Sequence, residues 1–357
     1  MQRLERIDHR VVFWTARRLF AARTAPIASG NPKRIVLVRL DERVGNLITL
    51  QSLIDALKRN IPGLNLGLLA STRSTQVTRT LEGVDRLFEL DKRWFFTRPL
   101  AWRKVIGDVR RAGYQVAVDA SAWAEFSFTH AALAFYSGAP VIIGTDHGSD
   151  PGFHTHRVCP GPADEYELKQ RMRLLEPLGI RVQPPALRTS LGTGQVKKWA
   201  GWLDDNGLAR PRIGLWPGAR KHHTRWPAAY FARLAERLKG GRLVLWGPGE
   251  ERLRDELTAG IGGSVAAPPT DLADLAGLLR GLDLLVCNDT GPMHLSVAAE
   301  TPTVCLFTSG KSSRWGHPYP HVRNLDLPGK DPQEVEAAYG ACQELLGSLT
   351  EKGDRVT

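Results

Sequence analysis

The sequence predicts an α/β protein built from two doubly wound, Rossmann-like domains. Short apolar runs of strand length alternate with amphipathic stretches of helical length, which is the pattern of a parallel sheet covered by helices on both faces. The alternation occurs in two series, separated near residues 181–194 by turn-forming residues with little periodicity. At 357 residues the chain is long for one domain and sufficient for two.

The first series begins after Pro32, where the buried-strand pattern RIVLVRL starts. We predict an N-terminal domain over 33–185, preceded by a basic amphipathic helical segment over 1–32. The expected strands are 34–40, 64–70, 86–90, 115–119 and 140–144, and the expected helices are 46–60, 98–112, 122–137 and 164–180.

The second series begins with RIGLW and predicts a C-terminal domain over 186–330, followed by a closing helix and tail over 331–357. The expected strands are 212–216, 242–246, 264–268, 282–287 and 301–307, and the expected helices are 227–239, 250–259, 271–280 and 293–300. Ligands of open α/β sheets bind at the carboxyl ends of the strands. We therefore expect the two domains to face each other across a substrate cleft.

The charge of the chain indicates an acidic partner. The formal net charge is +11 and the isoelectric point is near 9.7, which suits nucleic acid, anionic lipid or phosphorylated sugars. Zinc-finger spacing and an RNA-binding aromatic signature are both missing from the sequence, so nucleic acid is the least favoured of the three.

The cysteines and the apolar runs indicate a cytoplasmic protein. The four cysteines are widely spaced without a CxxC pair, as expected of reduced thiols. No apolar run approaches the roughly 20 residues that cross a bilayer. Segment 1–32 has two interpretations, a helix packed on the protein surface and a peripheral anchor on anionic lipid.

The stretch CNDTGPMHL (287–295) follows an apolar strand and leads into a helical pattern. Asn288, Asp289 and Thr290 are cap-type residues, and Pro292 suits the first turn of a helix. One interpretation is a plain strand-to-helix turn. The other is a phosphate site, because a helix N-terminus presents free N–H groups.

Two further loops lie at predicted strand ends. In WPGARKHHTRWP (216–227), Gly218 forms the turn, and the donors that suit phosphate oxygens are Lys221, His222, His223 and Arg225. The alternative is a solvated basic loop in which only Trp226 packs inward. In WGPGEE (246–251), Gly247 and Gly249 permit close backbone approach. Glu250 suits either the helix dipole or the hydroxyls of a ribose.

The lack of certain motifs argues against ATP hydrolysis and metal-dependent nucleotide binding. A P-loop motif does not occur, which argues against ATP hydrolysis, and an Asp-x-Asp site for a metal–nucleotide pair is also missing. Asp146, His147 and Asp150 in the loop 144–152 are interpreted as a polar loop in preference to a metal site. We therefore predict no metal ligands.

The stretch NDTGPMHLSVAAETPTVCLF, with WPGAR…RWPAAYFARLAERL and WGPGEE, resembles the heptosyltransferase family, glycosyltransferase family 9. Members have the two-domain GT-B fold and build the inner core of bacterial lipopolysaccharide. The first half agrees in RIVLVRL, a glycine turn and a helix ending near KRNIPG, and the similarity covers roughly residues 34–345. The resemblance implies transfer of heptose from ADP-heptose to a lipopolysaccharide core acceptor with inversion, without metal or other cofactor.

The resemblance also implies roles for single residues. Asp289 would hold sugar hydroxyls, and Thr290, Gly291 and His294 would cradle the pyrophosphate. Glu250 would take the ribose. The turn at Gly218 and Ala219 would support the diphosphate.

Two positions depart from the family pattern. Where members have Gly-Asp with a presumed general base, this chain has Gly45-Asn46, and asparagine cannot take a proton. Asp41 and Glu42 earlier in that loop are the candidate substitutes. Where a lysine is common the chain has Thr224, and Lys221 or Arg225 would supply the cation.

Three alternatives remain beside this function. They are a GT-B enzyme using another nucleotide sugar, a sugar-nucleotide epimerase, and a non-catalytic binding or scaffold protein marked by Asn46. In the leading interpretation the partners are a nucleotide sugar and an anionic glycolipid, with segment 1–32 touching the inner membrane face.

Overall fold

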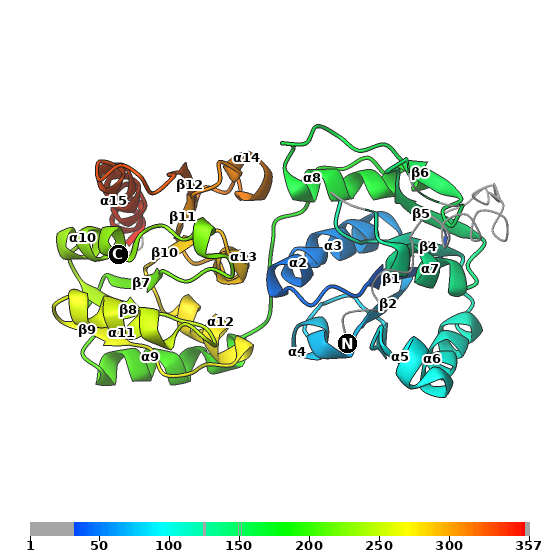
Figure 1. The fold of residues 1–357 in the computed structure, drawn as a ribbon, viewed down its shortest axis with the longest axis horizontal. Helices are drawn as coiled ribbons and strands as arrows, with labels where there is room; N and C mark the ends of the chain where they lie inside the picture. The colour runs from blue at the N-terminus through cyan, green and yellow to red at the C-terminus, as the bar shows by residue number, and fades with distance from the viewer. Residues whose placement is uncertain (1–31, 124–125, 149, 151, 354–357) are drawn as a thin grey trace, which may run out of the picture. The chain divides into compact units, whose positions relative to one another are not determined.

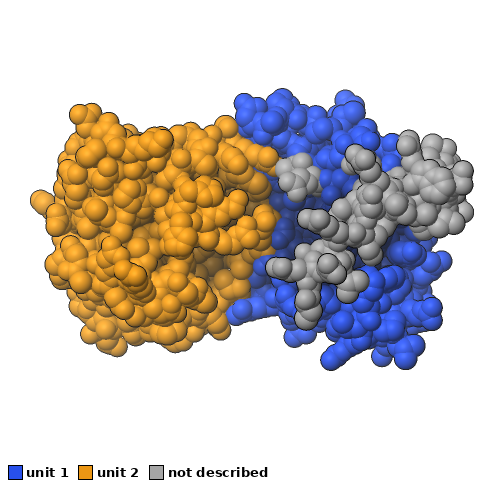
Figure 2. All heavy atoms as spheres, in the orientation of Figure 1, with its two compact units in different colours: residues 1–42, 52–186 blue, residues 43–51, 187–357 orange. Residues whose placement is uncertain are grey.

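The computed structural model describes residues 32–123, 126–148, 150 and 152–353, with side chains up to residue 348. Predicted segment 1–32 therefore lies outside the described residues, apart from Pro32. The chain divides into two compact units, drawn in different colours in Figure 2. The first unit comprises residues up to 42 and 52–186, and the second comprises 43–51 and 187–357.

The first unit contains a six-stranded parallel sheet in the order β3-β2-β1-β4-β5-β6 (Figure 1). This is the order of the doubly wound dinucleotide-binding fold. The strands are β1 Arg34–Arg39, β2 Asn65–Ser71, β3 Arg86–Leu90, β4 Val116–Asp119, β5 Val141–Thr145 and β6 His156–Val158. The helices are α3 Leu50–Asn60, α4 Thr75–Thr78, α5 Trp94–Thr97, α6 Pro99–Arg111, α7 Phe128–Tyr136 and α8 Glu167–Met172, with 3-10 turns η1 Thr72–Ser74 and η2 Arg173–Leu178.

The second unit repeats this topology, with the order β12-β11-β10-β7-β8-β9 and all pairs parallel. The strands are β7 Arg212–Trp216, β8 Gly241–Val244, β9 Ser264–Ala266, β10 Leu284–Asn288, β11 Thr303–Phe307 and β12 Val322–Asp326. The helices are α2 Val44–Ile48, α9 Val196–Asp205, α10 Ala228–Arg237, α11 Glu251–Gly260, α12 Leu272–Arg280, α13 Gly291–Ala298, α14 Ser312–Trp315 and α15 Glu334–Gly353, with 3-10 turns η3 Thr193–Gln195 and η4 His222–Thr224. The predicted α/β class with two doubly wound, Rossmann-like domains is confirmed.

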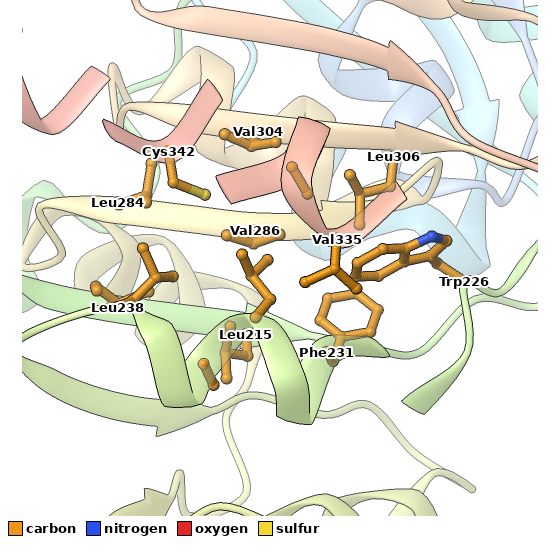
Figure 3. Packing of buried hydrophobic residues seen from close by; sticks show 14 of the residues in the cluster. Leu215, Trp226, Phe231, Leu238, Leu284, Val286, Val304, Leu306, Val335 and Cys342 are labelled. Atoms are coloured by element: carbon orange, nitrogen blue, oxygen red, sulfur yellow. The ribbon is translucent and has the colours of Figure 1, made fainter. Parts of the chain in front are cut away.

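The core of the second unit explains why its strands read as continuous apolar runs. Strands β7, β10 and β11 are buried along their whole length, because helices cover both faces of the sheet. Trp226 and Phe231 pack edge to face with ring centroids 5.2 Å apart, beside Val335 of α15 and Leu306 of β11 (Figure 3). The indole N–H of Trp226 donates to Glu334 Oε2 at 2.8 Å, so its one polar atom is satisfied.

Several predicted elements differ from the structure. The helix expected over 46–60 is divided at Thr49 into α2 and α3, which belong to different units. Only part of 164–180 is α-helical, since η2 follows at Arg173, and α7 begins at Phe128, later than the predicted 122. Strands β6 and β12 and helix α9 were not predicted. The two strands are at sheet edges and half-buried, so their apolar pattern is weak.

Each sheet has one point at which the strand order reverses, between β1 and β4 in the first unit and between β7 and β10 in the second. Such a switch point leaves a crevice outside the carboxyl ends of its strands. Within the described residues, no helix combines the length and apolar content that crossing a bilayer requires.

Candidate functional site

Asn288 joins the two strand ends at the switch point of the second sheet. It ends β10 and is fully buried. Its side-chain amide donates from Nδ2 to Pro217 O at 2.7 Å, and its Oδ1 accepts from Trp226 N at 2.9 Å. One side chain therefore holds both ends of the loop 217–226 against the end of β10. This role explains the asparagine before Asp289, which we had interpreted only as a cap-type residue.

Glu250 lies against the Gly218 turn. A Cβ atom on Gly218 would be only 2.0 Å from Glu250 Oε2, so glycine is the residue that admits the carboxylate here. The same oxygen accepts from Gly247 N at 3.0 Å, and Arg225 Nη2 lies 3.7 Å from Glu250 Oε1. Burial raises the pKa of Glu250, opposed by the Gly247 hydrogen bond and the Arg225 charge. The loops after β7 and β8 thus meet around one carboxylate.

Arg225 is the cation that the structure brings to this loop. Its Nε donates to Ala219 O at 2.8 Å, and its Nη1 lies 3.1 Å from His222 Nδ1. Lys221 is exposed, and its carbonyl accepts from the Thr224 backbone N–H at 3.0 Å. Of the two cations expected to compensate for Thr224, Arg225 is therefore the one fixed beside Glu250.

The turn after β10 starts helix α13 as predicted. Thr290 is the N-cap in extended conformation, Gly291 is the first helical residue, and Pro292 lies in the first turn. Burial raises the pKa of Asp289 to about 6, opposed by the positive charge of Lys311. Lys311 precedes α14 in the loop after β11, next to β10 in the sheet. Sequence reasoning missed Lys311, although it follows the next predicted strand end.

His294 is buried on α13 and packs against α2. Its Nδ1 lies 2.8 Å from His317 Nε2, and its ring meets that of Trp315 with centroids 6.3 Å apart. A Cβ atom on Gly45 would be 2.4 Å from His294 Cδ2, so Gly45 allows α2 to approach α13. Burial lowers the pKa of His317 well below its usual value, and the charge of His294 acts in the same direction. His317 was not predicted, because its place depends on this packing.

The three candidate catalytic residues lie on the segment between β1 and α3. Asn46 is on α2, only 8% exposed, and its carbonyl accepts from Thr49 Oγ1 at 3.0 Å. Asp41 Oδ2 accepts from Arg39 Nη2 at 3.1 Å, and Glu42 Oε2 lies 3.5 Å from Arg73 Nη1. Both carboxylates are therefore ion-paired.

Arg39 ties together the two strand ends at the switch point of the first sheet. It is fully buried and donates from Nη1 to Ala120 O after β4, as well as to Asp41 after β1. Burial lowers the pKa of Arg39 to about 10, and nearby Arg171 adds to that effect. Asp41, the candidate base, is thus oriented by a buried guanidinium.

A buried charged triad follows on the same sheet. His154 Nε2 lies 3.2 Å from Asp119 Oδ2, and its Nδ1 lies 3.3 Å from Asp150 Oδ2. Burial opposes protonation of His154, yet the two carboxylates raise its pKa to about 9. Asp150, which we placed in a polar loop, also pairs with Arg157 at 3.2 Å. Within the described residues, no three His, Cys, Asp or Glu side chains are grouped as metal ligands.

Comparison with known proteins places this chain in a family. The family model described as glycosyltransferase family 9 (heptosyltransferase) matches residues 102–327. A lipopolysaccharide heptosyltransferase 1 from Pseudomonas aeruginosa is 26% identical over 317 residues, covering 83% of this chain and 84% of the relative.

Two solved structures have the same fold. The family 9 glycosyltransferase from Veillonella parvula superposes with a TM-score of 0.76 at 19% identity, covering 89% of this chain and 100% of that one. The Escherichia coli heptosyltransferase WaaC with ADP superposes with a TM-score of 0.67 at 20% identity, covering 87% and 99%. The fold is therefore GT-B. The chain belongs to glycosyltransferase family 9, the heptosyltransferases, and is a glycosyltransferase.

Proposed function

We propose that this enzyme transfers heptose from ADP-heptose to a lipopolysaccharide core acceptor, with inversion and without a metal ion. The observation that carries the proposal is the meeting of the three strand-end loops in the second unit, where Asn288 fixes the 217–226 loop and Gly218 admits Glu250. The family and the names of its members supply the donor and acceptor classes.

In this proposal the donor's diphosphate lies at Thr290 and Gly291, the start of α13. The helix dipole and free N–H groups favour negative charge there, and Arg225 adds a cation near Ala219. His294 supports the cradle from within, through its packing on His317. Together these groups stabilise the charge that develops on the departing ADP.

The two carboxylates have separate tasks. Glu250 accepts hydrogen bonds from the ribose hydroxyls, and its raised pKa reflects a buried position suited to uncharged hydroxyls. Asp289 accepts hydrogen bonds from the heptose hydroxyls, with Lys311 nearby. Each is at a carboxyl end of the second sheet, on opposite sides of the switch point.

In the transfer step the acceptor hydroxyl oxygen attacks the anomeric carbon as the bond to the diphosphate breaks. The hydroxyl proton passes to a carboxylate and ADP leaves. Asn46 cannot take that proton, so we propose Asp41 or Glu42 as the base. The acceptor binds the first unit. The enzyme acts at the cytoplasmic face of the inner membrane, where the acceptor is anchored.

We test the donor assignment by calorimetric binding of ADP, UDP and GDP in the presence of a chelator. ADP is expected to bind most tightly, and Glu250→Gln is expected to weaken ADP binding about tenfold through the lost charge-assisted hydrogen bonds. Preference for UDP or GDP would instead favour a GT-B enzyme that uses another nucleotide sugar.

The donor affinity is expected to depend on the protonation of Asp289. Its pKa of about 6 means that the carboxylate form dominates only above that pH. Affinity for ADP-heptose should therefore fall by up to about tenfold per unit as the pH drops below 6. Asp289→Asn should weaken binding at pH 8 and remove this dependence. ADP, which lacks the sugar, is the control ligand: a loss of ADP affinity matching that of ADP-heptose would contradict the assignment of Asp289 to the sugar.

A further inference from the structure

The first unit exposes a small apolar ridge, which we define as Phe95, Phe96 and Leu100. Their side chains are 51%, 81% and 79% exposed, and they are the only exposed large hydrophobic residues in the part of the chain that the structure describes. All three lie within six positions, on α5 and the first turn of α6 (Figure 1). Single exposed apolar residues are common, whereas exposed apolar residues grouped on neighbouring helices are typical of a binding surface.

The ridge is displayed on a supported element. The ring of Phe95 meets Phe96 edge to face with centroids 4.9 Å apart and meets Trp102 at 5.4 Å, and Trp102 in turn meets Tyr136 of α7 at 5.6 Å. On the opposite side of α6, Ile106 and Val109 are buried in the core of the unit. The inner face of α6 is therefore already packed in the core, and the ridge lies outside that packed face.

The chain entering α5 is also fixed. Asp91 at the end of β3 accepts from Arg93 Nη2 at 2.6 Å and from the Arg93 backbone N–H at 2.9 Å. The Trp94 N–H then donates to the Asp91 carbonyl at 2.9 Å. These bonds set the direction in which the aromatic residues leave the sheet.

The surroundings of the ridge are strongly basic. Residues 92–111 contain seven Lys and Arg but only one acidic residue, Asp108, which pairs with Arg111. Along α6, Arg103 and Lys104 follow Leu100 by three and four positions, so the three share one face of the helix. Five of these cations are exposed and have no carboxylate partner among the described side chains: Lys92, Arg98, Arg103, Lys104 and Arg110.

We propose that the ridge and its flanking cations dock onto an anionic lipid bilayer. Phe96 and Leu100 enter the boundary between headgroups and acyl chains, while the basic side chains contact lipid phosphates. The inference rests on the proposed function in one respect: a lipid-anchored acceptor makes the bilayer surface the place of work. It locates the contact on α5 and α6 of the first unit, whereas the sequence had suggested segment 1–32.

A second copy of the chain fits the surface less well. An aromatic residue buries roughly 150–250 Å², so three side chains supply less than the ~800 Å² per partner of a stable protein interface. Two like-charged surfaces of this composition would also repel each other. An anionic bilayer has the complementary charge.

We test the proposal by flotation of the full-length protein with vesicles of phosphatidylethanolamine and phosphatidylglycerol, and with vesicles of phosphatidylcholine alone. The wild type should bind the anionic vesicles preferentially. Phe96→Ser with Leu100→Ser should lower the partition coefficient by about tenfold or more. Arg103→Glu with Lys104→Glu should lower it at least as much, since each basic residue near an anionic surface contributes about fivefold.

The matched control is Lys197→Glu with Arg252→Glu, two exposed residues of the second unit that change the net charge equally. This pair should retain most of the binding. A control that loses as much as the ridge variants would show a nonspecific charge effect and overturn the proposal.

A site-specific measurement separates the ridge from any other lipid contact. An environment-sensitive dye on Leu100→Cys, in a Cys159→Ser background, should shift to the blue on anionic vesicles, while the dye on Arg252→Cys should not. Cys159 is removed because it is the exposed thiol among the four cysteines. No shift at position 100 overturns the proposal, as does a wild-type dimer that the ridge variant abolishes while vesicle binding persists.

These experiments distinguish failure of the docking proposal from failure of the proposed function. Vesicle binding needs neither donor nor acceptor, so it stands whatever the enzyme transfers. If both the membrane docking and the proposed function are correct, the enzyme carrying Phe96→Ser with Leu100→Ser should transfer heptose to a deacylated acceptor in solution at the wild-type rate. Its rate should fall only when the acceptor is embedded in vesicles. An equal loss with both acceptors would contradict membrane docking and place the ridge in acceptor binding.

Discussion

Replacing Gly218 with alanine is expected to lower kcat/KM for the nucleotide-sugar donor by about 10²-fold with little effect on stability. The added Cβ would stand 2.0 Å from Glu250 Oε2. The carboxylate is the far end of a flexible side chain, so it can move at little cost to the fold. Moving the carboxylate breaks its hydrogen bond from Gly247 N and its ion pair with Arg225. Glu250 is then displaced from the position in which we propose that it binds the ribose hydroxyls.

Gly262→Ala is the matched control for this prediction. It adds the same methyl group in the turn between α11 and β9, where no atom beyond the neighbouring residues lies within 4 Å of the new Cβ. Steady-state kinetics and thermal unfolding of both variants make the comparison. If Gly218→Ala retained wild-type kcat/KM, or if both variants lost activity equally, the position of Glu250 would not matter to catalysis.

Replacing His154 with alanine is expected to lower the free energy of unfolding at neutral pH by about 3–5 kcal/mol. The change removes the cation that the buried carboxylates of Asp119 and Asp150 share, and it leaves Asp150 with Arg157 as its remaining partner. The Asp119 carboxylate also accepts from Ser121 N at 2.9 Å, so the loop after β4 should loosen as well. Denaturant unfolding followed by circular dichroism measures the effect.

The pH dependence identifies the charge of His154 as the cause. Its pKa is raised from 6.5 to about 9 in the folded state, so its contribution is fully present below pH 6.5 and is lost as the pH rises through 9. The difference between wild type and His154→Ala should therefore narrow over that window. His156→Ala, two residues along the chain on strand β6, should cost less than about 1 kcal/mol. A pH-independent difference would mean that packing, not charge, explains the loss.

Much of the fold was predictable because the burial of a strand or helix produces a local pattern of apolar residues in the sequence. Fully buried central strands such as β7 and β10 have to be apolar along their length, and amphipathic helices such as α10 alternate at helical period. The edge strand β12 shows no such pattern. The division of helix 46–60 at Thr49 was also hidden, since α2 joins the second unit through the contact of Gly45 with His294, a residue far away in the sequence.

The candidate site was predictable to the extent that strand ends carry it. The turn at Asp289–Gly291 and the loops at Gly218 and Glu250 could be placed because each directly follows an apolar run. The partners that hold them could not. The two hydrogen bonds of the Asn288 side chain and the charge of Lys311 beside Asp289 depend on the order of strands in the sheet. That order cannot be read from the sequence alone.

The most direct measurement of the central claim is mass spectrometry of a lipopolysaccharide core acceptor after incubation with enzyme and ADP-heptose, with a chelator present. We predict that the acceptor gains one heptose, that ADP is released in equal amount, and that either Asp41→Asn or Glu42→Gln abolishes the gain while ADP binding persists. Transfer that requires another nucleotide sugar, or ADP binding with no transfer to any core acceptor, would contradict the account.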